Sequence, residues 1–168
     1  MPDKILTATA TMPTTTKLGA EHLDGGPIEL LAEDEERGTF AGLAIAFDSP
    51  VQTWVPTIVK RGAFRDTLRR RGNRVKILRE HNPELLIGTP IALKETAEGL
   101  YIRARITEET EAGREALALM RMSPPALDRM SIGFDVNEFK EVKKSQIPWT
   151  DGKPLNSTLR VITSIELF

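Results

Sequence analysis

The sequence predicts a single domain of mainly β structure with a few helices (α+β), arranged as a β-barrel or a sandwich. Short apolar segments, several alternating with a period of two, recur along the chain between turn residues. Only two segments have the apolar spacing of a helix, and they do not alternate with strands as the βαβ units of a parallel sheet do. The length of 168 residues, 40% of them hydrophobic, is enough for one core.

The N-terminal part of the chain differs in composition from the rest. Residues 1–27 are rich in Thr, Gly and Pro and lack periodicity, so we expect a flexible arm there and the folded domain at residues 28–168. The segment GTFAGLAIAFDSP, residues 38–50, follows with apolar residues in a small-residue background, which predicts a buried strand and a turn. Residues 53–64, TWVPTIVKRGAF, predict another short extended piece.

Two segments predict helices. From Ala63 to Arg71, Phe64 and Leu68 are spaced i, i+4 among basic residues, and Gly72-Asn73 ends the pattern. The segment EETEAGREALALMRM, residues 108–122, is the clearer helix. It opens with acidic residues, which suit the positive end of a helix dipole, and Ser123-Pro124-Pro125 stops it.

The remaining segments predict strands. VKILREH, residues 75–81, runs into His81, where Asn82-Pro83 forces a turn. Residues 87–107 predict a hairpin around Glu98-Gly99, whose second arm alternates apolar and polar residues. Two further strands are expected at Met130–Val136 and from Leu159 to the C-terminus.

Composition excludes several classes of site. There are no cysteines, so disulfides, thiolate metal sites and cysteine nucleophiles are excluded. The net charge of −1 argues against binding nucleic acid through overall charge. No window approaches the roughly 20 apolar residues of a membrane span, and the N-terminus lacks the apolar core of a secretory signal, so we expect a soluble protein. No His-Glu-x-x-His motif is present, and we expect neither a metal nor another cofactor.

Ser131 interrupts an otherwise apolar strand, RMSIGF. In a strand with period two, Met130, Ile132, Phe134 and Val136 share the core face, so Ser131, Gly133 and Asp135 share the opposite face. Glycine inside a strand often marks the close approach of a ligand or another backbone. Ser131 is therefore either a presented hydroxyl or simply an outward-facing strand residue.

His81 is the other candidate reactive side chain. The chain has two histidines, and the second, His22, falls in the expected arm. His81 lies at the end of a strand before a proline-containing turn, where it either carries function or only terminates the strand. A serine becomes a good nucleophile when an imidazole takes its proton, and the imidazole works best beside an orienting acceptor. Candidate acceptors are Glu166, Asp135, Glu80 and Glu84.

An ordered series of motifs resembles the prohead (capsid-maturation) serine protease family of tailed phages and prophages. The series is RGAFRDTL, VKILREHNPELLIGTP, EGLYIRARI, AGREALALMR and MSIGFDV, spread over roughly residues 38 to 168. The resemblance implies that His81 is the catalytic base and Ser131 the nucleophile. It also implies a fold similar to that of the herpesvirus assemblin proteases, which is a β-barrel ringed by helices.

For the third catalytic residue the sequence leaves two alternatives. The family continues past the last strand into an acidic E-V-S segment, and this chain stops at Phe168, just before it. Glu166 in the final strand is therefore the candidate within the chain, and the alternative is an acid beyond Phe168 in a truncated or self-cleaved form. By alternation, Glu166 would share a strand face with Ile162, opposite Ile165 and Leu167.

Three functions follow for testing. The first, implied by the resemblance, is a serine endopeptidase that cleaves phage scaffold and major capsid protein, and itself, inside the assembling procapsid in the bacterial cytoplasm. The second is a catalytically silent assembly module that binds scaffold or capsid protein, and either form could act as a homo-oligomer. The third is nucleic-acid binding through the basic run RRRGNR, which is more simply the solvated face of a short helix. We expect no specific nucleic-acid partner and no membrane partner.

Overall fold

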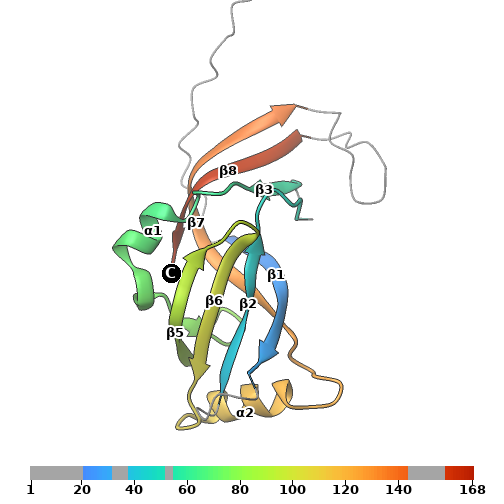
Figure 1. Ribbon diagram of the computed structural model, residues 1–168, viewed down its shortest axis with the longest axis vertical. Coiled ribbons are helices and arrows are strands. Elements are labelled where there is room, and N and C mark those ends of the chain that lie inside the picture. Colours follow the sequence, from blue (N-terminus) through green and yellow to red (C-terminus); the bar gives the residue numbers. More distant parts are fainter. Residues whose placement is uncertain (1–20, 32–37, 52–54, 144–157) are drawn as a thin grey trace, which may run out of the picture.

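The computed structural model describes residues 21–31, 38–51, 55–143 and 158–168. These residues form one eight-stranded sheet in the order β3-β8-β7-β1-β2-β6-β5-β4, with two α-helices and a short 3-10 helix, which confirms the mainly β, α+β class (Figure 1). In chain order the elements are β1 (Glu21–Leu30), β2 (Thr39–Ala46), β3 (Thr57–Val59), α1 (Arg65–Arg70), η1 (Gly72–Arg74), β4 (Ile77–Leu78), β5 (Leu86–Glu95), β6 (Gly99–Ile106), α2 (Glu111–Met120), β7 (Arg129–Lys143) and β8 (Thr158–Leu167).

The long strand β7 joins the two parts of the sheet. Its first residues pair antiparallel with β1, and from Phe134 onward it pairs with β8. In Figure 1, β7 crosses from the β7–β8 ribbon to the part of the sheet formed by β1, β2, β6 and β5. Because β8 ends opposite Phe134, one side of the β7 segment 129–133 has no neighbouring strand among the described residues.

The sheet is open, so the expected closed barrel is wrong. Its two edge strands, β3 and β4, have three and two residues and do not pair with each other within the described chain. Each edge strand pairs with only a small part of its neighbour, β3 with three residues of β8 and β4 with two residues of β5. Alternation of apolar residues sets which face of a strand is buried, but it does not encode which edges meet.

The first strand lies where the flexible arm was expected. Residues 1–20 lie outside the described part of the chain, but residues 21–27 belong to β1, so the expected arm does not extend to residue 27. Asp24-Gly25-Gly26-Pro27 resembles a turn in sequence and instead forms a bulge in the pairing with β7. A Cβ at Gly25 would lie 2.1 Å from the carbonyl oxygen of Ala44, so the close approach of β1 and β2 requires glycine there.

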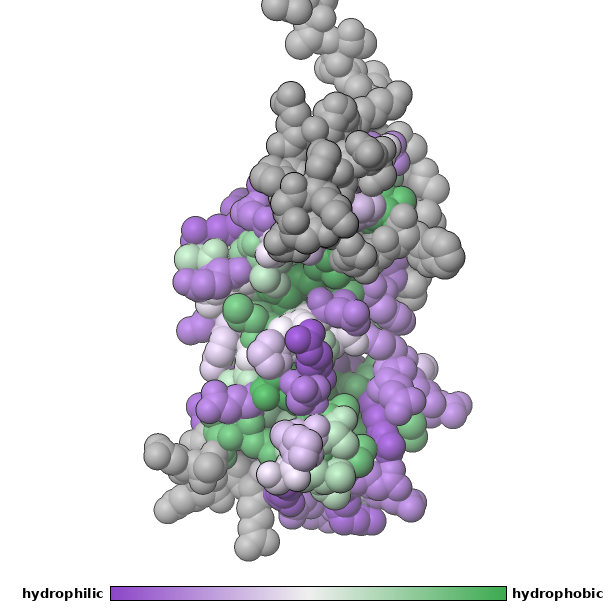
Figure 2. All heavy atoms as spheres, turned by 90° about the vertical axis from the view of Figure 1, so that its right-hand side faces the viewer, coloured by the Kyte–Doolittle hydropathy of each residue, from purple (hydrophilic) through white to green (hydrophobic). Residues whose placement is uncertain are grey.

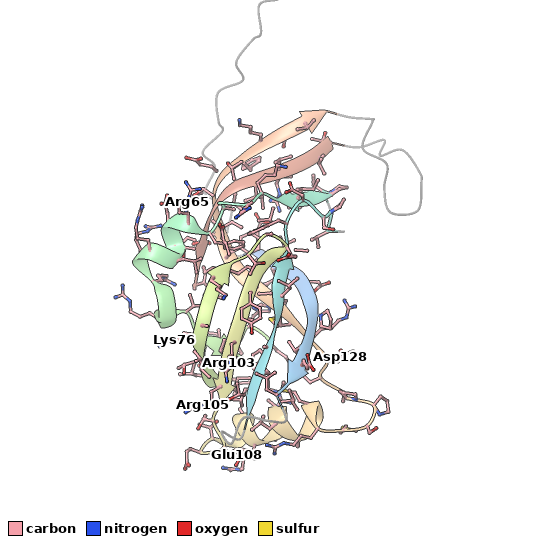
Figure 3. All side chains as sticks on the ribbon, in the orientation of Figure 1. Arg65, Lys76, Arg103, Arg105, Glu108 and Asp128 are labelled. Carbon is pink, nitrogen blue, oxygen red and sulfur yellow. The ribbon has the colours of Figure 1, made fainter. Side chains whose placement is uncertain are left out.

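The expected hairpin is confirmed, with β5 and β6 joined at residues 96–98. On β6 the predicted alternation holds, because Leu100, Ile102, Ala104 and Ile106 are all buried. Figure 3 labels Arg103 and Arg105 of this same strand among the side chains of the sheet.

Both predicted helices are present and shorter than expected. Thr110 caps α2 by accepting a hydrogen bond from the Gly113 amide, and Ala116, Leu117 and Met120 are buried. The start of α1 is held from another element. The Glu95 carboxylate on β5 accepts hydrogen bonds from the amides of Gly62 and Phe64, and Phe64 itself is fully buried.

The surface is mixed. Hydrophobic residues reach the face shown in Figure 2 in areas bordered by hydrophilic ones. Within the described residues, neither helix has the length and apolar character that a membrane-spanning helix needs.

Candidate active site

A tight loop after β4 presents His81. The Arg79 carbonyl accepts a hydrogen bond from the Asn82 amide, and the Arg79 amide donates to the Leu85 carbonyl, so the loop closes on itself. The Asn82 side chain also accepts a hydrogen bond from the Glu84 amide. Glu80 and His81 both have positive φ, 52° and 56°, which is unusual for residues other than glycine. Such backbone strain is maintained where the surrounding structure fixes it, and it turns the His81 ring toward β7.

Ser131 lies on β7 as its period-two pattern predicts. Ile132, Phe134 and Val136 are buried, whereas Ser131 is exposed on the opposite face. Met130, also predicted on the core face, is only partly buried against that core. The hydroxyl is therefore presented at the surface by a strand whose other face is fixed in the core.

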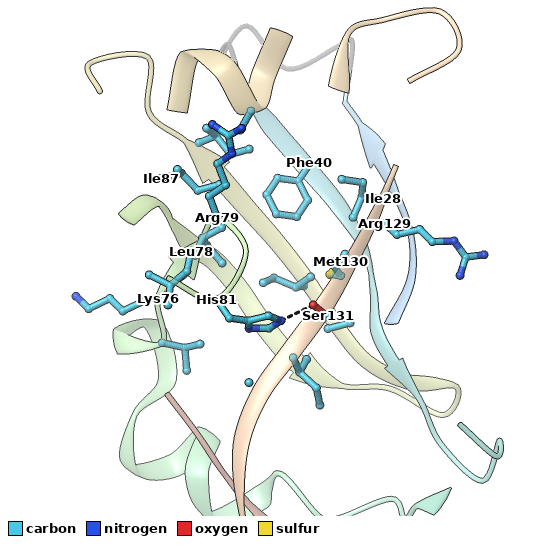
Figure 4. Close-up of a pocket in the computed structure, with 18 of the residues that line it drawn as sticks. Ile28, Phe40, Lys76, Leu78, Arg79, His81, Ile87, Arg129, Met130 and Ser131 are labelled. Atoms are coloured by element: carbon cyan, nitrogen blue, oxygen red, sulfur yellow. Dashed lines mark hydrogen bonds between the residues drawn. The ribbon is translucent and has the colours of Figure 1, made fainter. Parts of the chain in front are cut away.

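The structure brings the two predicted residues together. The His81 Nε2 atom lies 2.5 Å from the Ser131 Oγ atom, within hydrogen-bonding distance (Figure 4). When the neutral imidazole carries its proton on Nδ1, the serine hydroxyl donates to Nε2. This is the contact that a general base needs to take the proton of a serine nucleophile.

Two further site residues lie on β1 and were not expected. His22 pairs in register with Gly133, and Asp24 pairs with Ser131, so both side chains lie on the face that carries Ser131. The His22 ring stacks on the His81 ring, with a centroid separation of 3.8 Å and an interplanar angle of 15°. Both residues lie in the segment 1–27, which its composition predicted to be a flexible arm. The alternation of His22, Leu23 and Asp24 is the one local signal of a strand, and it is too short to outweigh the following Gly-Gly-Pro.

The environment of His81 favours its neutral form. Partial burial lowers the pKa of His81 below its ordinary value, and the charge of His22 lowers this pKa further. The Asp24 carboxylate acts in the opposite direction and raises this pKa, but it is the smallest of the three effects. A base that is neutral at physiological pH is ready to accept the serine proton.

Gly133 makes room for the histidine ring. A Cβ at this position would lie 3.2 Å from His81 Nδ1 and 2.8 Å from Cε2 of Phe168. A larger residue would therefore push at least one of the two rings away from β7. The glycine of the S-I-G-F segment thus has a geometric role beside Ser131.

An apolar cavity adjoins the serine. It has a volume of about 310 Å³ and is bounded by residues 76–81 on one side and 129–133 on the other. Figure 4 shows Ile28, Phe40 and Met130 grouped beyond Ser131 in this cavity. Apolar residues from several elements line it, among them Ile28, Phe40, Leu78, Ile87, Leu127 and Met130.

The structure does not bring Glu166 to His81. Its carboxylate forms ion pairs with Arg70, the last residue of α1, and with Arg71, which follows it. Asp135 faces Glu166 across the β7–β8 pair. The Glu80 carboxylate forms an ion pair with the Arg79 side chain, with 3.8 Å between Oε1 and Nε. The backbone amide of Glu84 donates a hydrogen bond to the Asn82 side chain. Within the described chain, no carboxylate hydrogen-bonds to the His81 ring.

The basic run is largely occupied by contacts within the protein. Arg69 pairs with Asp66, Arg70 and Arg71 pair with Glu166, and the Arg74 side chain donates to the Arg70 carbonyl. The Arg70 and Arg71 contacts join the end of α1 to β8, and the Arg69 and Arg74 contacts are local to α1 and η1. Among the residues that the structure describes, no group of three or more acidic or histidine side chains is placed to hold a metal ion.

A known family model matches most of the chain. The family model described as caudovirus prohead serine protease matches residues 27–168, which include both Ser131 and His81. The chain belongs to the caudovirus prohead serine protease family. The match does not include His22 and Asp24, which precede it. No curated protein and no solved structure matches the chain significantly, so the similarity of this prohead protease family member to the assemblin fold stays a prediction.

Proposed function

We propose that this chain is a serine endopeptidase in which Ser131 is the nucleophile and His81 the general base. The observation that supports this most directly is the contact of 2.5 Å between Ser131 Oγ and His81 Nε2, in a chain of a serine protease family. Ser131 is exposed and so is not required for packing, and His81 is held at a positive φ that few residues other than glycine adopt.

The geometry fits an acyl-transfer reaction. His81 Nε2 takes the Ser131 proton as Oγ attacks the peptide carbonyl carbon, and the resulting imidazolium then protonates the leaving amine. This leaves an ester between Ser131 and the N-terminal part of the substrate. In the second half His81 takes a proton from water, whose oxygen attacks the ester carbonyl carbon. The imidazolium then returns that proton to Ser131 Oγ as the ester bond breaks and the product leaves as a carboxylic acid.

The family also supports a setting for this reaction. We propose that the substrates are phage scaffold and major capsid proteins, and the protease itself, inside the assembling procapsid in the host cytoplasm. The apolar cavity beside Ser131 would accept an apolar substrate side chain near the scissile bond. Binding of that side chain would hold the substrate carbonyl against the nucleophile.

Covalent labelling combined with cleavage tests the proposal. The wild-type chain should react with a fluorophosphonate probe at Ser131 and cleave its capsid or scaffold protein. Ser131→Ala should lose both properties and keep the fold, since removal of a nucleophile costs several orders of magnitude in rate. Ser164→Ala, a half-buried serine on β8, is the matched control and should retain both.

Two outcomes would contradict the proposal. Cleavage by Ser131→Ala at near the wild-type rate would show that another residue is the nucleophile. Binding of capsid or scaffold protein by a folded wild-type chain that neither reacts with the probe nor cleaves would favour the silent assembly module.

A further inference from the structure

The orientation of His81 is the feature of the proposed active site that the predicted residues do not explain. In a serine protease the imidazole works best when a third group fixes its orientation and its tautomer. Here the Glu166 carboxylate is paired with Arg70 and Arg71, and no carboxylate of the described chain hydrogen-bonds to the His81 ring. Another contact must therefore hold the ring in line with Ser131.

The His22 ring makes that contact. It lies nearly parallel to the His81 ring, at 15°, with 3.8 Å between the ring centroids. In such a stack the in-plane nitrogen atoms of one ring do not point at those of the other. His22 therefore does not occupy the place of a hydrogen-bonding third member of a catalytic triad. It restricts the tilt of the His81 ring by covering one of its faces.

The sheet fixes His22 in this position. The β1–β7 pairing puts His22 directly opposite Gly133, two residues from Ser131 on the same face. A Cβ at Gly133 would be 3.2 Å from His81 Nδ1, so the His81 ring lies close to the β7 backbone beside the His22 ring. The strand that presents the nucleophile thus also sets the position of His22.

We propose that His22 is a positioning residue for His81, and that its stacked ring holds the imidazole in line with the Ser131 hydroxyl. This inference rests on the proposed protease function. His22 precedes the residues matched by the family model, so the proposal concerns a feature of this chain and is not carried over from the family.

The charges around His81 make a second readout available. On β1, His22 and Asp24 act on the charge of the His81 ring, and on β7 the Ser131 hydroxyl contacts it. The loop that carries His81 contributes Arg79 and Glu80, whose side chains form an ion pair at 3.8 Å between Nε and Oε1. The charge of His22 lowers the pKa of His81. Replacing His22 by an uncharged ring should therefore raise that pKa while it preserves the stack.

Three variants separate stacking from charge and from general effects on β1. His22→Ala removes the ring and should lower kcat by about 10- to 100-fold, since small displacements of a reacting group have effects of this size. His22→Phe keeps a flat ring and should recover most of that loss, with the acidic limb of its pH profile moved upward. Glu29→Ala, an exposed position on the same strand, is the control and should behave as the wild type.

A spectroscopic measurement tests the stack even in a chain without activity. The protein has two histidines, so His22→Phe and His22→Ala each leave His81 as the single imidazole in an NMR titration. The ring protons of His81 should show an upfield ring-current shift in the wild type and in His22→Phe, and lose it in His22→Ala. The same comparison can be repeated in the Ser131→Ala background, in which self-cleavage does not occur.

These readouts distinguish failure of the inference from failure of the proposed function. Absence of the upfield shift in the folded wild type overturns the inference whether or not the protein is a protease. In an active protein, wild-type kcat in His22→Ala, or equal loss in His22→Ala and His22→Phe, overturns it as well. An inactive wild type that shows the shift and the pKa change would support the stack and contradict the protease.

Discussion

At the scale of single residues, the proposed active site depends on Gly133 as well as on Ser131 and His81. Gly133→Ala places a methyl group 3.2 Å from His81 Nδ1 and 2.8 Å from the Phe168 ring. The distance of 2.8 Å to Phe168 is shorter than a van der Waals contact, so either a ring or the backbone must move. The β7 backbone is fixed by its pairing with β1, so we expect the His81 ring or the Phe168 ring to shift. A shift of the His81 ring should lower kcat/KM by about 10²-fold.

Peptide hydrolysis, with circular dichroism to verify the fold, would measure this effect. Asn137→Ala, an exposed position further along β7, is the control and should retain wild-type kcat/KM. A Gly133→Ala protein with unchanged kcat/KM would show that the His81 ring tolerates a side chain at this position.

The lowered pKa of His81 predicts a pH dependence. In the proposed mechanism the neutral form of His81 is the base, so kcat/KM should rise with pH and reach half of its plateau below 6.5, the ordinary pKa of histidine. The folded protein disfavours the protonated form of His81. The contribution of His81 to the free energy of unfolding is therefore fully present above pH 6.5. That contribution should be lost as the pH falls from 6.5 through the lower pKa of the folded protein. A kinetic midpoint at or above 6.5 would contradict this account.

The positions of Ser131 and His81 in the fold could be predicted from the sequence because the signals for them are local, whereas their catalytic roles stay a proposal. The alternation in MSIGFDV places Ser131 on the open face, and Asn82-Pro83 marks the turn after His81. The partnership of His22 with His81 depends on the pairing of β1 with β7, more than 100 positions apart in the chain. No local pattern encodes that register, so sequence analysis missed His22 and Asp24.

At the scale of elements, Glu166 connects the last strand to α1. Its carboxylate accepts a hydrogen bond from Arg70 and forms an ion pair with Arg71, and the Arg71 side chain also donates to the Leu167 carbonyl at 2.6 Å. The Thr67 hydroxyl of α1 accepts from the Leu167 amide at 3.0 Å, which ties the same two elements together. The placement of Glu166 is thus explained by the packing of α1 on β8.

Glu166→Gln tests whether this carboxylate also acts in catalysis. Loss of the acid that orients a catalytic histidine costs about 10⁴-fold in kcat. With its carboxylate held by two arginines, we expect Glu166→Gln to keep kcat close to the wild-type value. The free energy of unfolding should fall by about 1 kcal/mol or less, because the arginine side chains are 58% and 40% exposed. A loss near 10⁴-fold, with the fold intact, would make Glu166 the third catalytic residue after all.

Strand irregularities limited what alternation could predict about these elements. The alternation puts Ile162 on the face opposite Ile165 and Leu167, yet all three side chains are buried. Two register shifts in the β7–β8 pairing, on either side of Glu138, account for the difference. The β5–β6 hairpin was predicted because its turn residues and alternation agree, although its pairing also has one irregularity, between Pro90 and Ala92.

At the scale of the whole molecule, the open sheet explains how a cavity and a reactive pair come to lie together. The edge strand β4 and the β7 segment 129–133 bound opposite sides of the apolar cavity, and each has a side that no described strand covers. In a closed barrel the edge strands β3 and β4 would pair with each other, and the sheet would have no open edge. The opening thus leaves backbone and apolar surface available next to Ser131.

β1 holds the two parts of this sheet together, because it lies between β7 and β2 in the strand order. A chain that begins at residue 28 would lack the partners of Ser131 to Phe134 in β1, and with them His22 and the buried Leu23. We therefore expect it to lose stability and activity together, because the backbone groups of β7 and the core beneath them become exposed to water. A chain that begins at Glu21 keeps every described contact of β1 and is the matched control. Urea denaturation and probe labelling of Ser131 in both chains would measure the difference. A stable and reactive chain from residue 28 would show that residues 21–27 of β1 are dispensable. It would then support the flexible arm that the composition of these residues predicted.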